Sequence, residues 1–209
     1  MTKIYLPLLF VSTFFLRSLY SQNLPVTQNI EMAKIKSGDI IKFFGENIRY
    51  PSNALMDNIE GIVIIGFRIT KDGLIDSIQV IKNPNQNLSL EALRVLDKTN
   101  GLWIPTKSNG IPIDKNYIAS FGFFTSSKYY DSRNKGLNYF KKGDYNKALS
   151  SINKSLAIDE YDTKLYETRL AIYKNLNDVE SIKRDSAKID YLKRNLITNI
   201  FVTAMPVRR

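Results

Sequence analysis

The N-terminal segment is apolar without any period. Residues 4–16 form a predominantly apolar run between Lys3 and Arg17, and small residues follow. As a helix this run rises about 20 Å, whereas the hydrocarbon core of a bilayer is about 30 Å thick. The pattern therefore predicts a secretory signal peptide over residues 1–21 and export of the remaining chain. An uncleaved signal anchor and a buried core helix are the alternatives.

The next segments change from no pattern to strict alternation. Residues 22–39 are polar and weakly patterned, which indicates an N-terminal lead. A short helix is expected from Pro51 onward, since proline suits the first helical turn. Between residues 61 and 70 apolar side chains occupy every second position, as in a strand with one buried face. Lys71-Asp72-Gly73 then favours a tight hairpin with a return strand over residues 74–82.

A helical period follows the hairpin. Leu90, Leu93 and Leu96 lie on one stripe of a helix, which Asn87 or Ser89 would cap. Gly101 is a natural place for the helix to stop.

A third strand is expected over residues 113–124, with Tyr117, Ala119, Phe121 and Phe123 on one face. Strand, hairpin, strand, helix and strand together predict an α+β fold over residues 40–125, with the helix on one face of a small sheet. If the third strand is an edge, its unpaired N–H and C=O groups form a template for another chain.

Short motifs in this region occur in a fixed order. They are Tyr50-Pro51, Gly61-x-Val63, Phe67, Asp72-Gly73, Glu91-Ala92-Leu93, Trp103-x-Pro105 and Asn109-Gly110-x-Pro112. In this order and spacing they resemble the C-terminal domain of the TonB family. The resemblance implies a module in the periplasm of a Gram-negative envelope that grips the short N-terminal segment of an outer-membrane transporter.

The resemblance also implies where a partner binds. In that family the partner adds as a strand beside the last strand of the sheet, helped by residues just before the Tyr-Pro pair. The corresponding positions are Tyr117, Ile118, Ala119, Ser120 and Phe121 in the strand, and Asn47, Ile48 and Arg49 before the Tyr-Pro pair. Family energy transducers also carry a membrane anchor and a long Pro-rich segment, but this chain has seven prolines and no Pro-rich stretch.

The C-terminal half repeats itself. Residues 135–145 align with residues 169–179, an offset of 34 residues (135 to 169), which is the period of tetratricopeptide repeats. The first copy resembles that family, with Gly136 at a close approach of two helices and Tyr139 in the groove between them. The pattern predicts an all-α array over residues 128–209. The last helix is expected over residues 181–196, and the apolar tail after it either closes the stack or leans on the sheet.

Composition narrows the chemistry that the chain can perform. It contains no Cys and no His, which excludes thiolate and imidazole ligands, disulfides and triads with a His base. The net charge is +10, and the excess of bases lies in residues 127–209, where acids alternate with them as on a solvated helical face. No Gly-rich phosphate loop occurs. We therefore expect no enzymatic activity, cofactor, metal or nucleic acid.

The sequence favours a non-enzymatic periplasmic protein-binding adaptor. Its sheet would capture an extended peptide by strand addition, and its helical repeats would hold a second protein partner. Two alternatives stay open. One is an energy transducer for outer-membrane transport, with residues 4–20 retained as an inner-membrane anchor. The other is a structural envelope protein whose sheet edge is sealed within the chain or in a homodimer.

Overall fold

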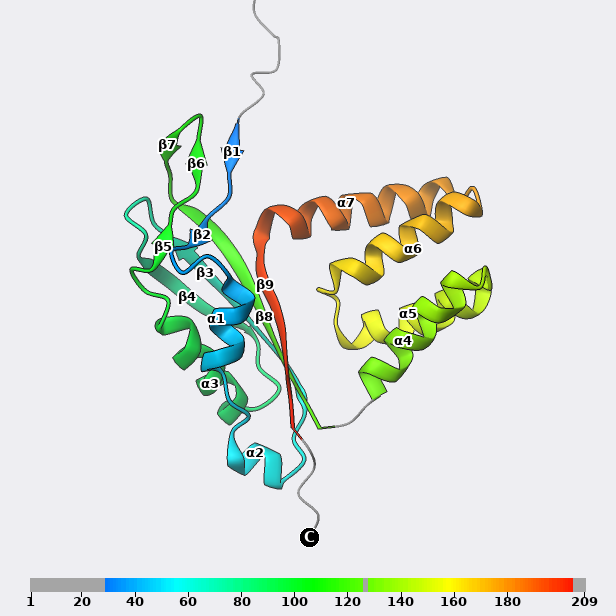
Figure 1. Ribbon diagram of the computed structural model, residues 1–209, viewed down its shortest axis with the longest axis horizontal. Coiled ribbons are helices and arrows are strands. Elements are labelled where there is room, and N and C mark those ends of the chain that lie inside the picture. The colour runs from blue at the N-terminus through cyan, green and yellow to red at the C-terminus, as the bar shows by residue number, and fades with distance from the viewer. Residues whose placement is uncertain (1–28, 126–127, 205–209) are drawn as a thin grey trace, which may run out of the picture.

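The computed structural model describes residues 29–125 and 128–204, which form a sheet-rich region followed by a helical region (Figure 1). The predicted signal peptide lies outside the described residues, as does the start of the lead. The strands are β1 (Ile30–Glu31), β2 (Lys34–Ile35), β3 (Gly61–Ile69), β4 (Ile75–Lys82), β5 (Trp103–Ile104), β6 (Lys107–Ser108), β7 (Ile111–Pro112), β8 (Lys115–Phe124) and β9 (Leu196–Thr203). The helices are α1 (Ile40–Asn47), α2 (Ser52–Met56), α3 (Gln86–Asp97), α4 (Lys128–Lys141), α5 (Tyr145–Ile158), α6 (Thr163–Asn175) and α7 (Val179–Asn195).

The main sheet has four strands in the order β4-β3-β8-β9. β3 runs antiparallel to β4, as the hairpin predicted, and on its other side it runs antiparallel to β8. β9 runs parallel to β8, from Ile118 opposite Leu196 to Phe124 opposite Thr203. The apolar tail after α7 is therefore a strand of the sheet. Within the predicted all-α segment over residues 128–209, the helices α4 to α7 lie between residues 128 and 195.

One face of the sheet carries the main core. The alternating residues of β3 and β8 point into it, as predicted, and α1 and α3 lie on this face (Figure 1). Phe44 of α1 packs edge-on against Phe121 of β8, with ring centroids 5.2 Å apart. The predicted stripe on α3 is wrong in part, because Leu90 is 56% exposed. Asn85 caps the helix earlier than expected, and the buried stripe consists of Leu88, Ala92, Val95 and Leu96.

The described part of the predicted lead, residues 29–39, pairs with other strands of the fold. β1 pairs with β6, and β2 pairs with β5. The N–H of Ala33 donates to the Tyr117 hydroxyl at 3.0 Å, and this hydroxyl also bonds the Thr106 hydroxyl at 2.5 Å. Two-residue strands leave no period in the sequence, so only the tertiary pairing shows them.

The helical region packs as two helix pairs, α4 with α5 and α6 with α7, which is compatible with helical repeats. Ala148, Ile152 and Leu156 of α5 share one buried core with Leu165 and Ile172 of α6. A Cβ placed on Gly136 of α4 would lie 2.8 Å from Ile152 Cγ1 and 3.2 Å from Ile152 N. The predicted close approach at Gly136 is therefore present.

We expect Gly136→Ala to lower the free energy of unfolding by about 1–3 kcal/mol, because the added methyl group meets the backbone of α5. Gly45→Ala in α1 is the matched control, since a Cβ there meets nothing within 4 Å. It should raise stability by about 0.5–1 kcal/mol. Urea denaturation of both variants measures the difference. Equal stability of Gly136→Ala and the wild type would show that the helices can separate at this point without cost.

Candidate functional site

The strand predicted to bind a partner lies inside the sheet. β8 pairs with β3 through Tyr117, Ala119 and Phe121, and with β9 on its other side. The same three side chains are at most 1% exposed, and Ser120 is buried as well. Residues 117–121 are therefore not at an edge of the sheet, and the predicted addition of a partner strand beside them is wrong. The neighbouring strand β9 lies more than 70 residues further along the chain (121 to 196), so no local signal announces the pairing.

The predicted partner-binding residues before the Tyr-Pro pair, Asn47, Ile48 and Arg49, contact either the core or α3. Ile48 is buried in the core that contains Phe121. Asn47 and Arg49 instead fasten the end of α1 to α3. The Arg49 N–H donates to Glu91 Oε1 at 2.6 Å, and Arg94 Nη2 donates to the Asn47 carbonyl at 2.7 Å.

The same contacts explain the charge state of Glu91. Partial burial opposes its ionisation, but hydrogen bonds from the Arg94 guanidinium and the Arg49 N–H outweigh it and hold the pKa of Glu91 below its usual range. These residues thus have a structural role at the α1–α3 contact.

β9 has one unpaired side. The Ala204 N–H donates to the Phe124 carbonyl at 3.2 Å, so the backbone groups of residue 204 point toward β8. Counting back by two, Val202 and Ile200 also direct their backbone groups toward β8. Because the direction of N–H and C=O alternates along a strand, Asn199, Phe201 and Thr203 direct these groups away from β8. Among the described residues no strand pairs with that side. The free edge at this end of the sheet is therefore β9.

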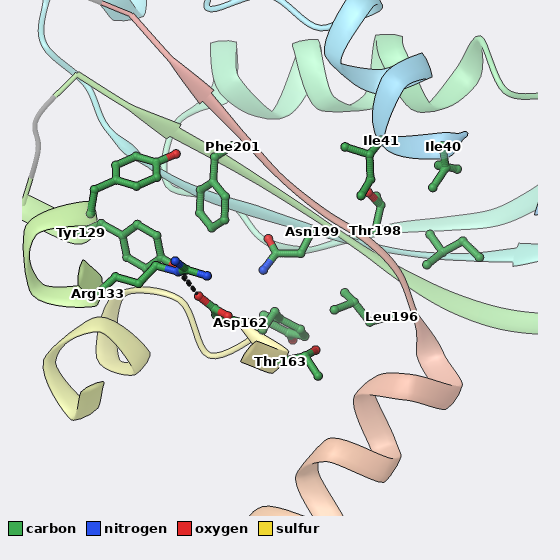
Figure 2. A pocket seen from close by; sticks show the side chains of 13 residues that line it. Ile40, Ile41, Tyr129, Arg133, Asp162, Thr163, Leu196, Thr198, Asn199 and Phe201 are labelled. Atoms are coloured by element: carbon green, nitrogen blue, oxygen red, sulfur yellow. Dashed lines mark hydrogen bonds and ion pairs between the residues drawn. The ribbon is translucent and has the colours of Figure 1, made fainter. Parts of the chain in front are cut away.

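A groove of about 500 Å³ runs along this edge, between α1 and the helical region (Figure 2). One wall is aliphatic and consists of Ile40 and Ile41 at the start of α1. The opposite wall is aromatic and polar and comes from α4, the turn before α6 and the first residue of α6. The residues of this wall are Tyr129, Tyr130, Arg133, Tyr161, Asp162 and Thr163. Leu196 to Asn199 and Phe201 of β9 lie between the walls.

The polar wall is held by hydrogen bonds around Asp162. Its Oδ2 accepts from the Tyr129 hydroxyl at 2.7 Å and from Arg133 Nε at 2.8 Å. Its Oδ1 accepts from the Leu165 N–H at 3.1 Å, which caps α6. Tyr129 also stacks on Phe201 of β9, with centroids 4.9 Å apart. Burial, followed by the charge of Asp162, raises the pKa of Tyr129, so this hydroxyl keeps its proton.

A second carboxylate joins the wall to β9. Asp159 is fully buried, and it accepts from Asn199 Nδ2 at 2.8 Å and from the Tyr161 N–H at 2.9 Å. Burial raises the pKa of Asp159, and the bonds from Asn199 and Tyr161 only partly oppose this shift. The helical region and β9 are therefore connected through buried polar contacts as well as through the chain.

Two adjacent residues of the groove keep polar atoms without partners. Thr198 Oγ1 and Asn199 Oδ1 are buried, and neither has a hydrogen bond within the described residues. A buried polar group without a partner costs about 1–3 kcal/mol. Because both residues line the groove, a ligand that supplied the missing bonds would recover this cost.

The residues of this groove carry little signal in the sequence. Asp162 and Arg133 carry no motif, and the sequence indicates the residues after Leu196 only as an apolar tail that closes the helical stack or leans on the sheet. The β-branched residues Ile197, Thr198, Ile200, Val202 and Thr203 are a signal that could have indicated a strand. In residues 29–125 and 128–204 no group of three acidic side chains is arranged to hold a metal ion.

The buried carboxyl of Asp159 makes stability depend on pH. Because burial raises its pKa in the folded state, the folded chain binds more protons than the unfolded chain above the unfolded pKa of about 3.9. Its contribution to the free energy of unfolding therefore falls as pH rises from that value to the folded pKa. We expect Asp159→Asn to lack this decline, measured by urea denaturation between about pH 4 and pH 7. Parallel curves for both proteins would contradict this assignment.

Comparison with known proteins covers the sheet region alone. Residues 46–123 match the family model for the Gram-negative bacterial TonB protein C-terminal. The search of curated proteins finds no match. No helix within residues 29–125 and 128–204 is long and apolar enough to cross a bilayer.

The matched residues include β3, β4, α3 and most of β8, whereas β9 and α4–α7 lie beyond them. Domains of this family are non-enzymatic protein-interaction modules, typical of Gram-negative periplasmic or envelope proteins, and they bind outer-membrane transporters and other proteins. Residues 46–123 of this chain are thus similar to the TonB C-terminal domain.

Proposed function

We propose that this protein is a non-enzymatic periplasmic adaptor that captures an extended segment of a partner protein as an additional strand on the outer side of β9. The free side of β9 inside the groove is the observation that carries the proposal. Residues 1–21 would direct export as a signal peptide. The N-terminal segment of an outer-membrane transporter is a candidate partner, because the family binds such transporters.

Backbone pairing alone is too weak for a useful complex. Four or five new hydrogen bonds at about 1 kcal/mol each give about 4–5 kcal/mol. A micromolar complex needs about 8 kcal/mol, before the cost of ordering the partner. The side-chain walls of the groove must therefore supply the difference. Ile41 is 60% exposed at the rim and offers apolar area for this purpose.

The other edge of the sheet is less suited to pairing. The register between β3 and β4 shifts between Ile64 and Ile65 and again between Gly66 and Arg68. Ser77 of β4 has a φ of +50°, which bends the strand. Bulges of this kind blunt an edge against a further strand.

The helical region takes part in the same site in this proposal. Tyr130 and Arg133 of α4 form the wall that faces β9, so a partner strand would touch both regions at once. The repeat-like helix pairs would then hold the partner that the sheet captures. The second protein partner expected on the helical repeats is a separate proposal, and we assign no residues to its binding.

Amide exchange by NMR tests strand addition residue by residue. Peptides selected on the mature chain from a random linear library serve as the probe. In the free protein the N–H groups of Asn199, Phe201 and Thr203 should exchange fast, whereas those of Ile200 and Val202 should be slow because they pair with β8. A bound peptide should slow the first three. Failure to select any peptide, or unchanged exchange at these positions, would overturn the proposal.

A matched pair of variants tests the location of the site. Ile41→Asp places a charge on the aliphatic wall, and we expect it to weaken peptide binding at least about tenfold. Ile81→Asp on β4 is the control, because Ile81 is similarly exposed (55%) but lies at the opposite edge. Calorimetric titration of both variants gives the affinities. Loss of binding in Ile81→Asp alone would assign the site to β4 and contradict the proposal.

A further inference from the structure

β9 presents alternate side chains to the two walls of the groove. Asn199 and Phe201 face the helical region, since Asn199 bonds Asp159 and Phe201 stacks on Tyr129. Ile200 faces the core that contains α1. Thr198 lies two residues before Ile200 in a regular part of the strand, so its side chain is on the α1 side as well. A strand added to β9 would divide its own side chains between the same two walls.

The α1 wall accepts an aliphatic side chain. Ile40 and Ile41 line it without any charged neighbour among the residues of the groove on that side. Thr198 is 5% exposed, and its hydroxyl lies in this wall without a partner. A hydroxyl both donates and accepts, so it can bond a backbone group of an incoming strand.

The helical wall requires a hydrogen-bond donor. Asn199 Nδ2 is already bound to Asp159, which fixes the side-chain amide and leaves Oδ1 as a free acceptor. The Tyr129 hydroxyl and the Arg133 Nε donate to Asp162. An ionised carboxylate only accepts hydrogen bonds, so it cannot bond the Oδ1 of Asn199.

We infer that the groove selects a segment with alternating character, with an aliphatic side chain toward Ile41 and, at the adjacent position, a hydrogen-bond-donating, non-acidic side chain toward Asn199. This inference rests on the proposed strand addition. Two buried polar atoms without partners, on adjacent residues that face opposite walls, carry it. The occupant is an extended segment of another protein, with the donor supplied by an amide or a cationic side chain.

Removing the unpartnered hydroxyl of Thr198 should affect the stability of the free protein and its affinity for a peptide in opposite directions. Thr198→Val removes a buried hydroxyl and keeps the shape, so the free protein should be at least as stable as the wild type. The affinity for a selected peptide should fall about fivefold, since the bound strand loses its partner. Urea denaturation and calorimetric titration of the same variant measure both effects.

Ser120→Ala is the matched control. Ser120 Oγ is also buried without a partner, but Ser120 does not line the groove. This variant should likewise keep or gain stability, while its affinity for the peptide stays unchanged. An equal loss of affinity in both variants, or none in Thr198→Val, would contradict a role of the Thr198 hydroxyl in recognition.

The selected peptides provide the second readout. We expect them to share a period of two, with Ile, Val or Leu next to Asn, Gln, Lys or Arg and with few acids. Replacing the donor residue of a selected peptide by an apolar residue of similar size should weaken binding about fivefold. Peptides that slow exchange at Asn199 and Phe201 without this pattern would overturn the inference and leave strand addition intact. If no peptide binds at all, strand addition itself is wrong.

Discussion

The parallel pairing of β9 with β8 is the interaction on which the rest of this structure depends. It covers the strand that would otherwise end the sheet, and it moves the free edge outward by one strand. It also brings the far end of the chain back to the sheet region, because α7 runs directly into β9 without a loop. A phenyl ring on β9, Phe201, then meets Tyr129 at the start of α4. One ladder of backbone bonds thus sets the sheet order, the position of the helices and the shape of the groove.

The groove is a product of both regions, which explains why a match to the sheet region describes only part of it. The matched residues end at position 123, before β9 begins. In this chain the side of β8 that faces away from β3 is covered by the chain's own strand, with Ser120 opposite Asn199. The polar bond between Asn199 and Asp159 then ties that strand to the helical region. Because β8 is covered on both sides, the proposed addition of a partner strand at this end of the sheet requires the outer side of β9.

The unpartnered atoms of Thr198 and Asn199 separate binding from stability. Elsewhere the buried polar groups of this site are well satisfied, as Asp162 shows with bonds from Tyr129, Arg133 and the Leu165 N–H. A buried hydroxyl or amide oxygen without a bond lowers the stability of the free protein. Buried polar atoms without partners are typical of functional sites, where a ligand supplies the missing hydrogen bond.

Local patterns were enough for much of the sheet region. Alternation at Val63, Ile65, Phe67 and Ile69 determined the buried face of β3, and Asp72-Gly73 determined the hairpin, since both depend only on neighbours along the chain. The close approach at Gly136 was likewise evident from the repeat. The neighbours of β8 were decided by tertiary structure alone. A parallel strand needs no turn and no matching pattern next to its partner, so the β-branched residues within 196–203 could indicate a strand but not its pairing with β8. The groove, whose walls come from α1, α4 and β9, exists for the same reason only in the folded chain.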